Sequence, residues 1–156
     1  MLINQELAAF MASPVMIILG TRDASLAPEI ARAVGSVVHQ EEGCVDLVVS
    51  EWQWPKTVAN VRANGQLAAT FARPSDYVSY QVKGHATVVS ATAEHITLAR
   101  RYMESMASTL GELGLEQRIV APWLVDRALV ALRLSVAEIF VQTPGAKAGQ
   151  LVGRLP

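Results

Sequence analysis

The spacing of apolar residues divides this chain into short β-strands with a few helices at their margins. Ile3, Leu7, Phe10 and Met11 recur at helical spacing, and Ser13-Pro14 predicts where this first helix ends. Later segments alternate apolar and polar residues, or run apolar over a few residues, between turn residues, which is typical of strands. The predicted strands are residues 15–20, 29–39, 44–50, 66–73, 77–91 and 129–142.

Three further segments carry helical patterns. A short helix is predicted at 55–64, because Asn64-Gly65 is a common helix stop. The longest helix is predicted at 94–110, and residues 115–128 are predicted to be helical around Pro122. The buried stripe of the longest helix is expected to be Ile96, Ala99, Met103 and Met106.

Most of the predicted strands are joined by short turns, which favours antiparallel pairing. A barrel is the simplest way for a small antiparallel sheet to avoid exposed edges. The fold class expected is therefore mainly β: a six-stranded antiparallel split β-barrel with flanking helices. Residues 1–142 form the expected domain, and the Gly- and Ala-rich tail at 143–156 is expected either to be mobile or to fold over a partner subunit.

Composition narrows the function classes. Hydrophobic residues make up 51% of the chain and charged residues only 17%, which favours an oligomer with an apolar interface. A net charge of −1 without a basic run argues against binding to nucleic acid or to an anionic membrane. The longest aliphatic run, residues 15–19, is too short to span a bilayer, and a cytoplasmic location is expected. The single cysteine, Cys44, is expected to be a small buried residue.

Lys56 and Thr57 are the first candidates for a binding site. A Lys in the first turn of a helix opposes the helix dipole, so it does not stabilise that helix. A helix end with free N–H groups, an ammonium and a hydroxyl suits a phosphate. The alternative is a solvated Lys beside a Thr that caps the helix.

Arg32 lies within a predicted strand and needs an anionic partner, either a ligand phosphate or a nearby carboxylate. Because side chains alternate along a strand, Arg32 is expected to share a face with Ile30 and Val34. The opposite face holds Ala31, Ala33 and Gly35, and these small residues are expected to let a flat ring or a second subunit approach the backbone.

The order of these features resembles the pyridoxamine 5′-phosphate oxidase-like, FMN-binding split-barrel family. That family has an Arg in one strand, a hydroxyl residue ending the next strand, and a basic residue six positions later. Arg32, Ser50 and Lys56 match this order. The resemblance implies that these residues and Thr57 bind the phosphate of FMN.

The resemblance also implies that the backbone from Ala33 through Val34 to Ser36 approaches the flavin ring. Gln81, before Gly84, resembles the family's ring-contacting Gln. Its spacing is one residue short, so Tyr80 or Ser79 is an alternative for that role.

The sequence departs from the true oxidases at several points. Pro55 replaces a second basic residue, and the segments that bind the pyridoxal substrate are missing from 94–110 and after Phe140. Pyridoxamine phosphate oxidation is therefore not expected. Trp52 and Trp54 are candidates either to cover a ligand or to pack on the barrel. His39, His85 and His95 are too widely spaced for a zinc or iron signature with Cys44.

Two functions follow. The first is an FMN-dependent oxidoreductase that acts on an unidentified small molecule, as a homodimer with the flavin at the interface. The flavin would supply the redox chemistry, so no catalytic side chain is named. The second is a non-catalytic protein on the same barrel that binds a flavin, haem or deazaflavin, or that has lost its ligand.

Overall fold

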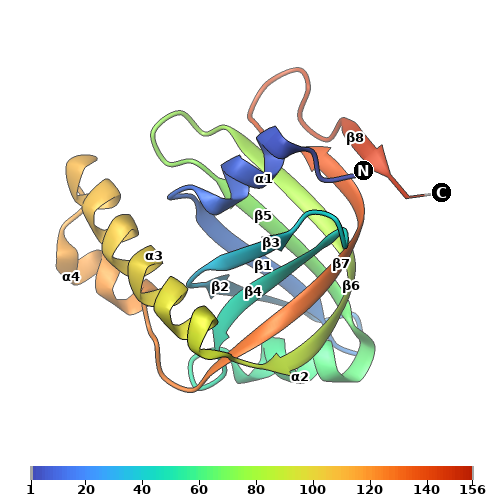
Figure 1. Ribbon diagram of the computed structural model, residues 1–156, viewed down its shortest axis with the longest axis horizontal. Coiled ribbons are helices and arrows are strands. Elements are labelled where there is room, and N and C mark those ends of the chain that lie inside the picture. Colours follow the sequence, from blue (N-terminus) through green and yellow to red (C-terminus); the bar gives the residue numbers. More distant parts are fainter. Residues whose placement is uncertain (1, 156) are drawn as a thin grey trace.

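The computed structural model describes residues 2–155, which form one antiparallel sheet curled into an open barrel, with helices around it (Figure 1). Seven strands are paired in the order β2-β1-β5-β6-β7-β4-β3, and β8 pairs with β7. This confirms the expected mainly β, split-barrel fold class. The strands are β1 (Met16–Arg22), β2 (Pro28–Ala33), β3 (Ser36–His39), β4 (Cys44–Ser50), β5 (Gln66–Ala72), β6 (Ser79–Ser90), β7 (Leu129–Val141) and β8 (Leu151–Arg154).

Two differences from the predicted six strands have local causes. The strand expected at 29–39 is interrupted at Val34-Gly35, where Gly35 has a φ of 152°. A Cβ atom at Gly35 would lie 3.0 Å from the Cδ2 atom of Leu98, so the chain turns there against the long helix. In the tail, β8 pairs with the second half of β7.

The helices close the ends of the barrel and cover one side (Figure 1). They are α1 (Gln5–Ala12), α2 (Pro55–Asn64), α3 (Ala93–Glu112), α4 (Gln117–Val120) and the 3-10 turn η1 (Ala121–Trp123). The helix predicted at 115–128 is thus two short turns followed by a loop. Among the described residues, no helix is long and apolar enough to cross a membrane.

The buried stripe of α3 agrees only in part with the one predicted from the sequence. Ala99 and Met106 are buried as expected, but Ile96 is 37% exposed. His95 and Leu110 are buried in its place. The stripe is shifted because the side chain of Thr92 caps the helix with a bond from the His95 N–H, and His95 then faces the barrel.

The interior of the barrel is filled by the inward faces of the strands. Ala31 and Ala33 belong to this interior and are 0% and 2% exposed. The expectation that their face receives a flat ring or a second subunit is therefore wrong: small side chains fit here because the opposite wall of the barrel is close. Cys44 is buried, as predicted.

A buried carboxylate connects α3 to the barrel. The side chain of Asp46 is 1% exposed and accepts two hydrogen bonds from Arg133, at 2.7 and 2.8 Å. The Nε2 atoms of His39 and His95 lie 3.0 and 3.1 Å from the same carboxylate. The Nδ1 atom of His95 accepts the Thr92 N–H, so its proton is on Nε2 and is donated to Asp46. This network joins α3, β3, β4 and β7.

We predict that Asp46→Asn lowers the free energy of unfolding at pH 7 by about 2 kcal/mol. Burial favours the neutral acid, but the bonds from Arg133, His39 and His95 outweigh it and lower the pKa of Asp46 from 3.8 to about 2. The stabilisation is therefore present above pH 4 and is lost as the pH falls from about 4 to about 2. Urea unfolding across this range measures it.

The matched control is Glu138→Gln, which removes an exposed ion pair with Arg154 and is expected to cost less than about 1 kcal/mol. An Asp46→Asn variant with the same acid dependence as the parent would show that the network does not hold a charge.

Candidate phosphate and flavin site

The candidate site lies where the corner between β2 and β3 meets β4. The Val34 N–H donates to the Val48 carbonyl at 2.8 Å, and the Val48 N–H donates to the Gly35 carbonyl at 2.9 Å. Arg32 precedes Val34 by two residues, and Ser50 follows Val48 by two. We call this short pairing of Val34 and Gly35 with Val48 the seam. Since paired antiparallel strands run in opposite directions, Arg32 and Ser50 lie at the same end of it. The structure thus brings together two of the predicted residues from separate strands.

Arg32 points away from the barrel interior. Among residues 2–155 it has no carboxylate within ion-pair distance, and its guanidinium lies 4.4 Å from the centre of the Trp123 ring. Burial lowers the pKa of Arg32 from its usual value, although a guanidinium stays protonated at neutral pH. Arg32 is thus a half-buried cation whose observed partner is an aromatic ring and not an anion.

Ser50 already uses its hydroxyl within the chain. It is 1% exposed, donates to the Arg127 carbonyl at 2.6 Å and accepts the Gln53 N–H at 3.2 Å. These bonds join the end of β4 to the loop before β7. A ligand phosphate can therefore bond to Ser50 only after the Arg127 carbonyl has moved.

Lys56 and Thr57 occupy the first turn of α2, as predicted. Pro55 is the first residue of that turn, Trp54 gives no side-chain cap, and the turn holds no acidic residue, so its N–H groups remain available to an anion. Lys56 is exposed, but Thr57 is fully buried, and its Oγ1 atom has no hydrogen-bond partner among the described residues. An unpartnered buried hydroxyl is uncommon.

The remaining predicted residues are divided between two surfaces. Gln81 shares the outer face of the sheet with Arg32, because the pairs Arg32–Ile18, Ile18–Thr70 and Thr70–Gln81 run straight across four strands. The Gln81 amide donates to Thr70 at 3.0 Å.

The side chains of Ala33 and Val34 do not face that surface. Ala33 points into the barrel, and Val34 is buried with Val48 and Ala99 beneath α3. Beside them lies a hollow of about 350 Å³, lined by Gly35, Ser36 and residues of α1 and α3. A ring that approaches the backbone after Val34 has space there.

Sequence reasoning missed the residues that cover the site. Trp123 lies over Arg32, and Arg127 lies over the exposed Trp52 at 4.5 Å. Trp123 and Arg127 belong to a segment about 70 to 90 residues later in the chain than the residues they cover. Nothing in the local pattern links them to Arg32 or Ser50. Of the two tryptophans before α2, Trp54 packs partly on the core.

Metal binding has no support in the described part of the chain. Within residues 2–155, no three His, Cys, Asp or Glu side chains are placed to hold an ion. His39 and His95 meet at Asp46, where Arg133 already neutralises the carboxylate.

Comparison with solved structures identifies the fold. The heme storage protein HutZ from Vibrio cholerae matches with a TM-score of 0.54 and 19% identity, over 90% of this chain and 95% of that one. An F420 reductase matches with a TM-score of 0.56 and 12% identity, over 84% and 93%. A candidate pyridoxamine 5′-phosphate oxidase from Lactobacillus delbrueckii matches with 0.55 and 13%, over 88% and 92%. No protein-family model matches the sequence, and no curated protein is similar to it.

This chain therefore has the split-barrel fold of the pyridoxamine 5′-phosphate oxidase-like proteins, which confirms the resemblance drawn from its sequence. At these identities the likeness concerns the fold alone. The three neighbours are named for different cofactors or reactions, so they do not select one function for this chain.

We predict that Thr57→Val leaves the free energy of unfolding of the ligand-free protein unchanged, or raises it by up to about 1 kcal/mol. Val keeps the shape of Thr and removes a hydroxyl that makes no bond in the folded state but is hydrated in the unfolded state. Chemical denaturation measures the change. A loss of more than about 1 kcal/mol would show that Oγ1 has a partner after all.

Proposed function

We propose that this protein binds FMN at the seam between β2 and β4, and that it is an oxidoreductase acting on an unidentified small molecule. The observation that carries the proposal is Arg32, a half-buried cation without a carboxylate partner among the described residues, at the same end of the seam as Ser50. A cation held in this way favours an anionic ligand, because burial weakens its hydration without supplying a counter-charge.

The proposed phosphate site consists of Arg32, Ser50, Lys56 and Thr57. Arg32 and Lys56 supply charge, and the first turn of α2 supplies free N–H groups. The unpartnered Oγ1 atom of Thr57 fits this site, since a bound phosphate would give it an acceptor once the atoms covering it have shifted.

The ring is proposed to lie along the backbone of Ala33, Val34 and the two following residues, beside the hollow of about 350 Å³. Gln81 is proposed as a polar contact of the ring from the resemblance alone, because it lies on the outer sheet face and not on the surface that holds the hollow. The flavin itself would supply hydride or electron transfer, while the chain binds it, orients it and limits access of water. The sequence lacks the segments that bind the pyridoxal phosphate substrate in the true oxidases. Pyridoxal phosphate chemistry is therefore not proposed for this protein. A cytoplasmic location also remains part of the proposal.

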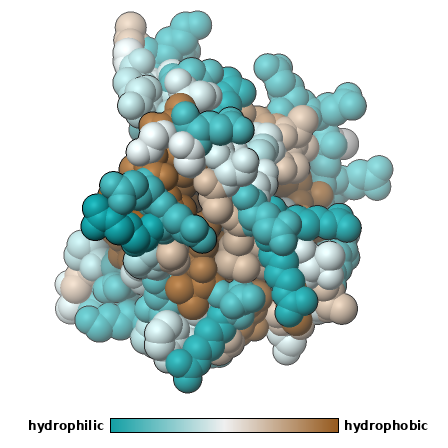
Figure 2. All heavy atoms as spheres, turned by 90° about the vertical axis from the view of Figure 1, so that its left-hand side faces the viewer, coloured by the Kyte–Doolittle hydropathy of each residue, from teal (hydrophilic) through white to brown (hydrophobic). Residues whose placement is uncertain are grey.

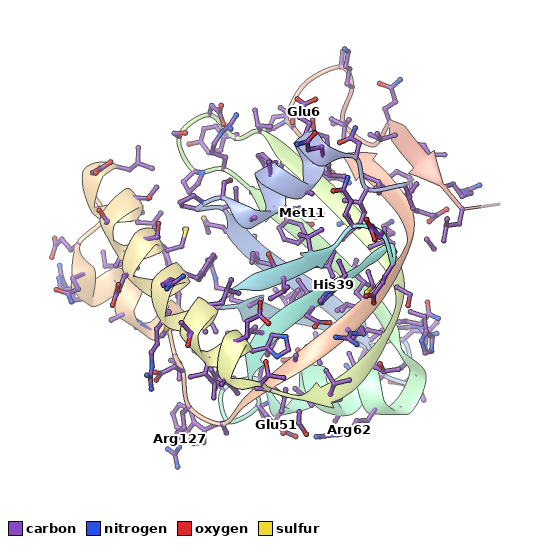
Figure 3. All side chains as sticks on the ribbon, viewed as in Figure 1. Glu6, Met11, His39, Glu51, Arg62 and Arg127 are labelled. Atoms are coloured by element: carbon purple, nitrogen blue, oxygen red, sulfur yellow. The ribbon has the colours of Figure 1, made fainter. Side chains whose placement is uncertain are left out.

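The alternative is a non-catalytic protein that binds a flavin, haem or deazaflavin on the same fold. Two neighbours with this fold support the alternative, because one is a heme storage protein and another is an F420 reductase. His39 is a half-exposed imidazole on the outer side of β3, although its Nε2 atom is already bonded to Asp46 (Figure 3).

The absorption spectrum of the purified protein separates these functions. Flavin bands, or a shift in the bands of added FMN, support the first proposal, and a Soret band supports haem. Riboflavin is the control ligand, since it lacks the phosphate and is expected to bind at least tenfold more weakly. A colourless protein that ignores added FMN contradicts the proposed flavin site.

We predict that Lys56→Ala weakens FMN binding about ten- to a hundredfold without lowering the melting temperature of the ligand-free protein. The variant removes one charge-assisted hydrogen bond, worth about 1.5–3 kcal/mol, from an exposed position. Titration of FMN followed by flavin fluorescence measures the change. Lys147→Ala, which removes an exposed Lys from the tail, is the matched control. Overlapping titration curves for Lys56→Ala and the parent would exclude Lys56 from the site.

We also predict a homodimer with the flavin at the interface. Ile30 is 67% exposed on the outer face of β2, beside Arg32, and Leu26 at the end of the same hairpin is 68% exposed. An apolar residue on the same face as the proposed site suits a second subunit. FMN and dimerisation are then expected to strengthen each other. Sedimentation of dilute protein with and without FMN tests this, and a monomer that binds FMN at full affinity contradicts it.

A further inference from the structure

Residues 115–128 form a strap across the proposed phosphate site. The strap leaves the end of α3, makes the two short turns α4 and η1, and joins β7. It lies on the side of the barrel where α3 and α4 project, and apolar atoms are visible there between polar side chains (Figures 1 and 2). Arg127, at its far end, lies at the same end of the barrel as Glu51 and α2 (Figure 3).

The strap is bound in two ways: Val120 is buried against Met106 and Leu110 of α3, and other strap residues contact the proposed site. Trp123 covers the Arg32 guanidinium at 4.4 Å. The Pro122 carbonyl accepts a bond from Gln53 Nε2 at 2.6 Å. The Arg127 carbonyl accepts the bond from Ser50 described above. The Trp123 ring thus covers one face of the Arg32 cation, and the Arg127 carbonyl accepts the hydroxyl proton of Ser50 that a phosphate would need.

On the side of Arg32 that Trp123 covers, the described residues leave too little space for a phosphate. The cavity between Arg32, Tyr102, Trp123 and their neighbours is about 10 Å³, roughly the space of one water molecule. A phosphate that reaches Arg32 from the side covered by Trp123 and also bonds to Ser50 must therefore displace Trp123 and the Arg127 carbonyl. Ligand and strap compete for the same two side chains.

The strap is built to move more easily than the sheet. Gly114 precedes it with a φ of 87°, and Ala128 ends it with a φ of 51°, an unfavourable backbone angle for a residue with a Cβ atom. Between these two points Val120 is the one buried apolar residue among those described, whereas Ile119 is 43% exposed and Trp123 and Leu124 are half-buried. A segment with few regular backbone bonds and half-buried contacts opens at lower free energy than the barrel.

We infer that the strap is a gate that closes the proposed phosphate site when no ligand is bound. This inference rests on the proposed function for its ligand, but the closed contact itself does not. The gate sets the apparent affinity, because only the open fraction of molecules can bind. If the open state is between about 1% and 10% of molecules, loosening the strap tightens binding by roughly ten- to a hundredfold.

Trp123→Ala and Gln53→Ala test the gate by removing one anchor each. The first measurement needs no flavin: modification of Arg32 by phenylglyoxal, followed by mass spectrometry of the peptide. We expect modification about tenfold faster in both variants than in the parent. Ile119→Ala is the matched control, since it shortens an exposed apolar residue of the same strap away from Arg32. Circular dichroism confirms that each variant is folded.

The second measurement is the dissociation constant for FMN. We expect both variants to bind FMN about tenfold or more tightly than the parent, and Ile119→Ala to bind like the parent. Equal rates of Arg32 modification in parent and variants overturn the gate. Weaker FMN binding by Trp123→Ala also overturns it, because Trp123 would then be a ligand contact. Faster modification with no FMN binding by any protein supports the gate and contradicts the proposed flavin site.

Discussion

The seam between the β2–β3 corner and β4 is the constraint on which the rest of this structure depends. Two backbone hydrogen bonds, Val34 to Val48 and Val48 to Gly35, hold together parts of the sheet that are otherwise at its two ends. Because the seam is short, the barrel stays open beyond it. Gly35 allows this geometry by letting α3 pack directly on the backbone at the corner.

Burial of polar groups explains how the outer layer is arranged around the seam. Asp46 is fully buried, and Arg133, His39 and His95 satisfy its charge, so α3 is fixed in position on the barrel. At the other end of β4 the polar groups are less well matched. Arg32 has an aromatic ring in place of an anion, and Thr57 has no partner among the described residues. The polar cluster at Asp46 is thus complete, whereas among the described residues Arg32 of β2 has no carboxylate partner and Thr57 of α2 has no hydrogen-bond partner for its hydroxyl.

The fold limits the function without selecting it. Neighbours with the same barrel and less than 20% identity are named for heme storage, F420 reduction and pyridoxamine phosphate oxidation. The parts of this chain that bear on the proposed function are the side chains at the seam and the strap that lies over them. Both features concern how a ligand reaches the site, and they are independent of the chemistry that the bound group carries out.

The sequence by itself predicted most of the strand and helix order and the antiparallel split barrel, and it named Arg32, Ser50, Lys56 and Thr57 as a candidate phosphate site. These follow from local periodicity, turn residues and the spacing of a known family pattern. Only the tertiary structure decided which way each side chain faces. Ala31 and Ala33 fill the interior because the barrel curves around them.

The strap over Arg32, the network at Asp46 and the break at Gly35 were likewise set by tertiary structure. Each joins residues far apart in the chain, such as Arg32 with Trp123 or Asp46 with Arg133. Local periodicity records which residues are apolar and how often they recur. It holds no information on which distant segment packs over a given side chain, because that depends on how the whole sheet closes.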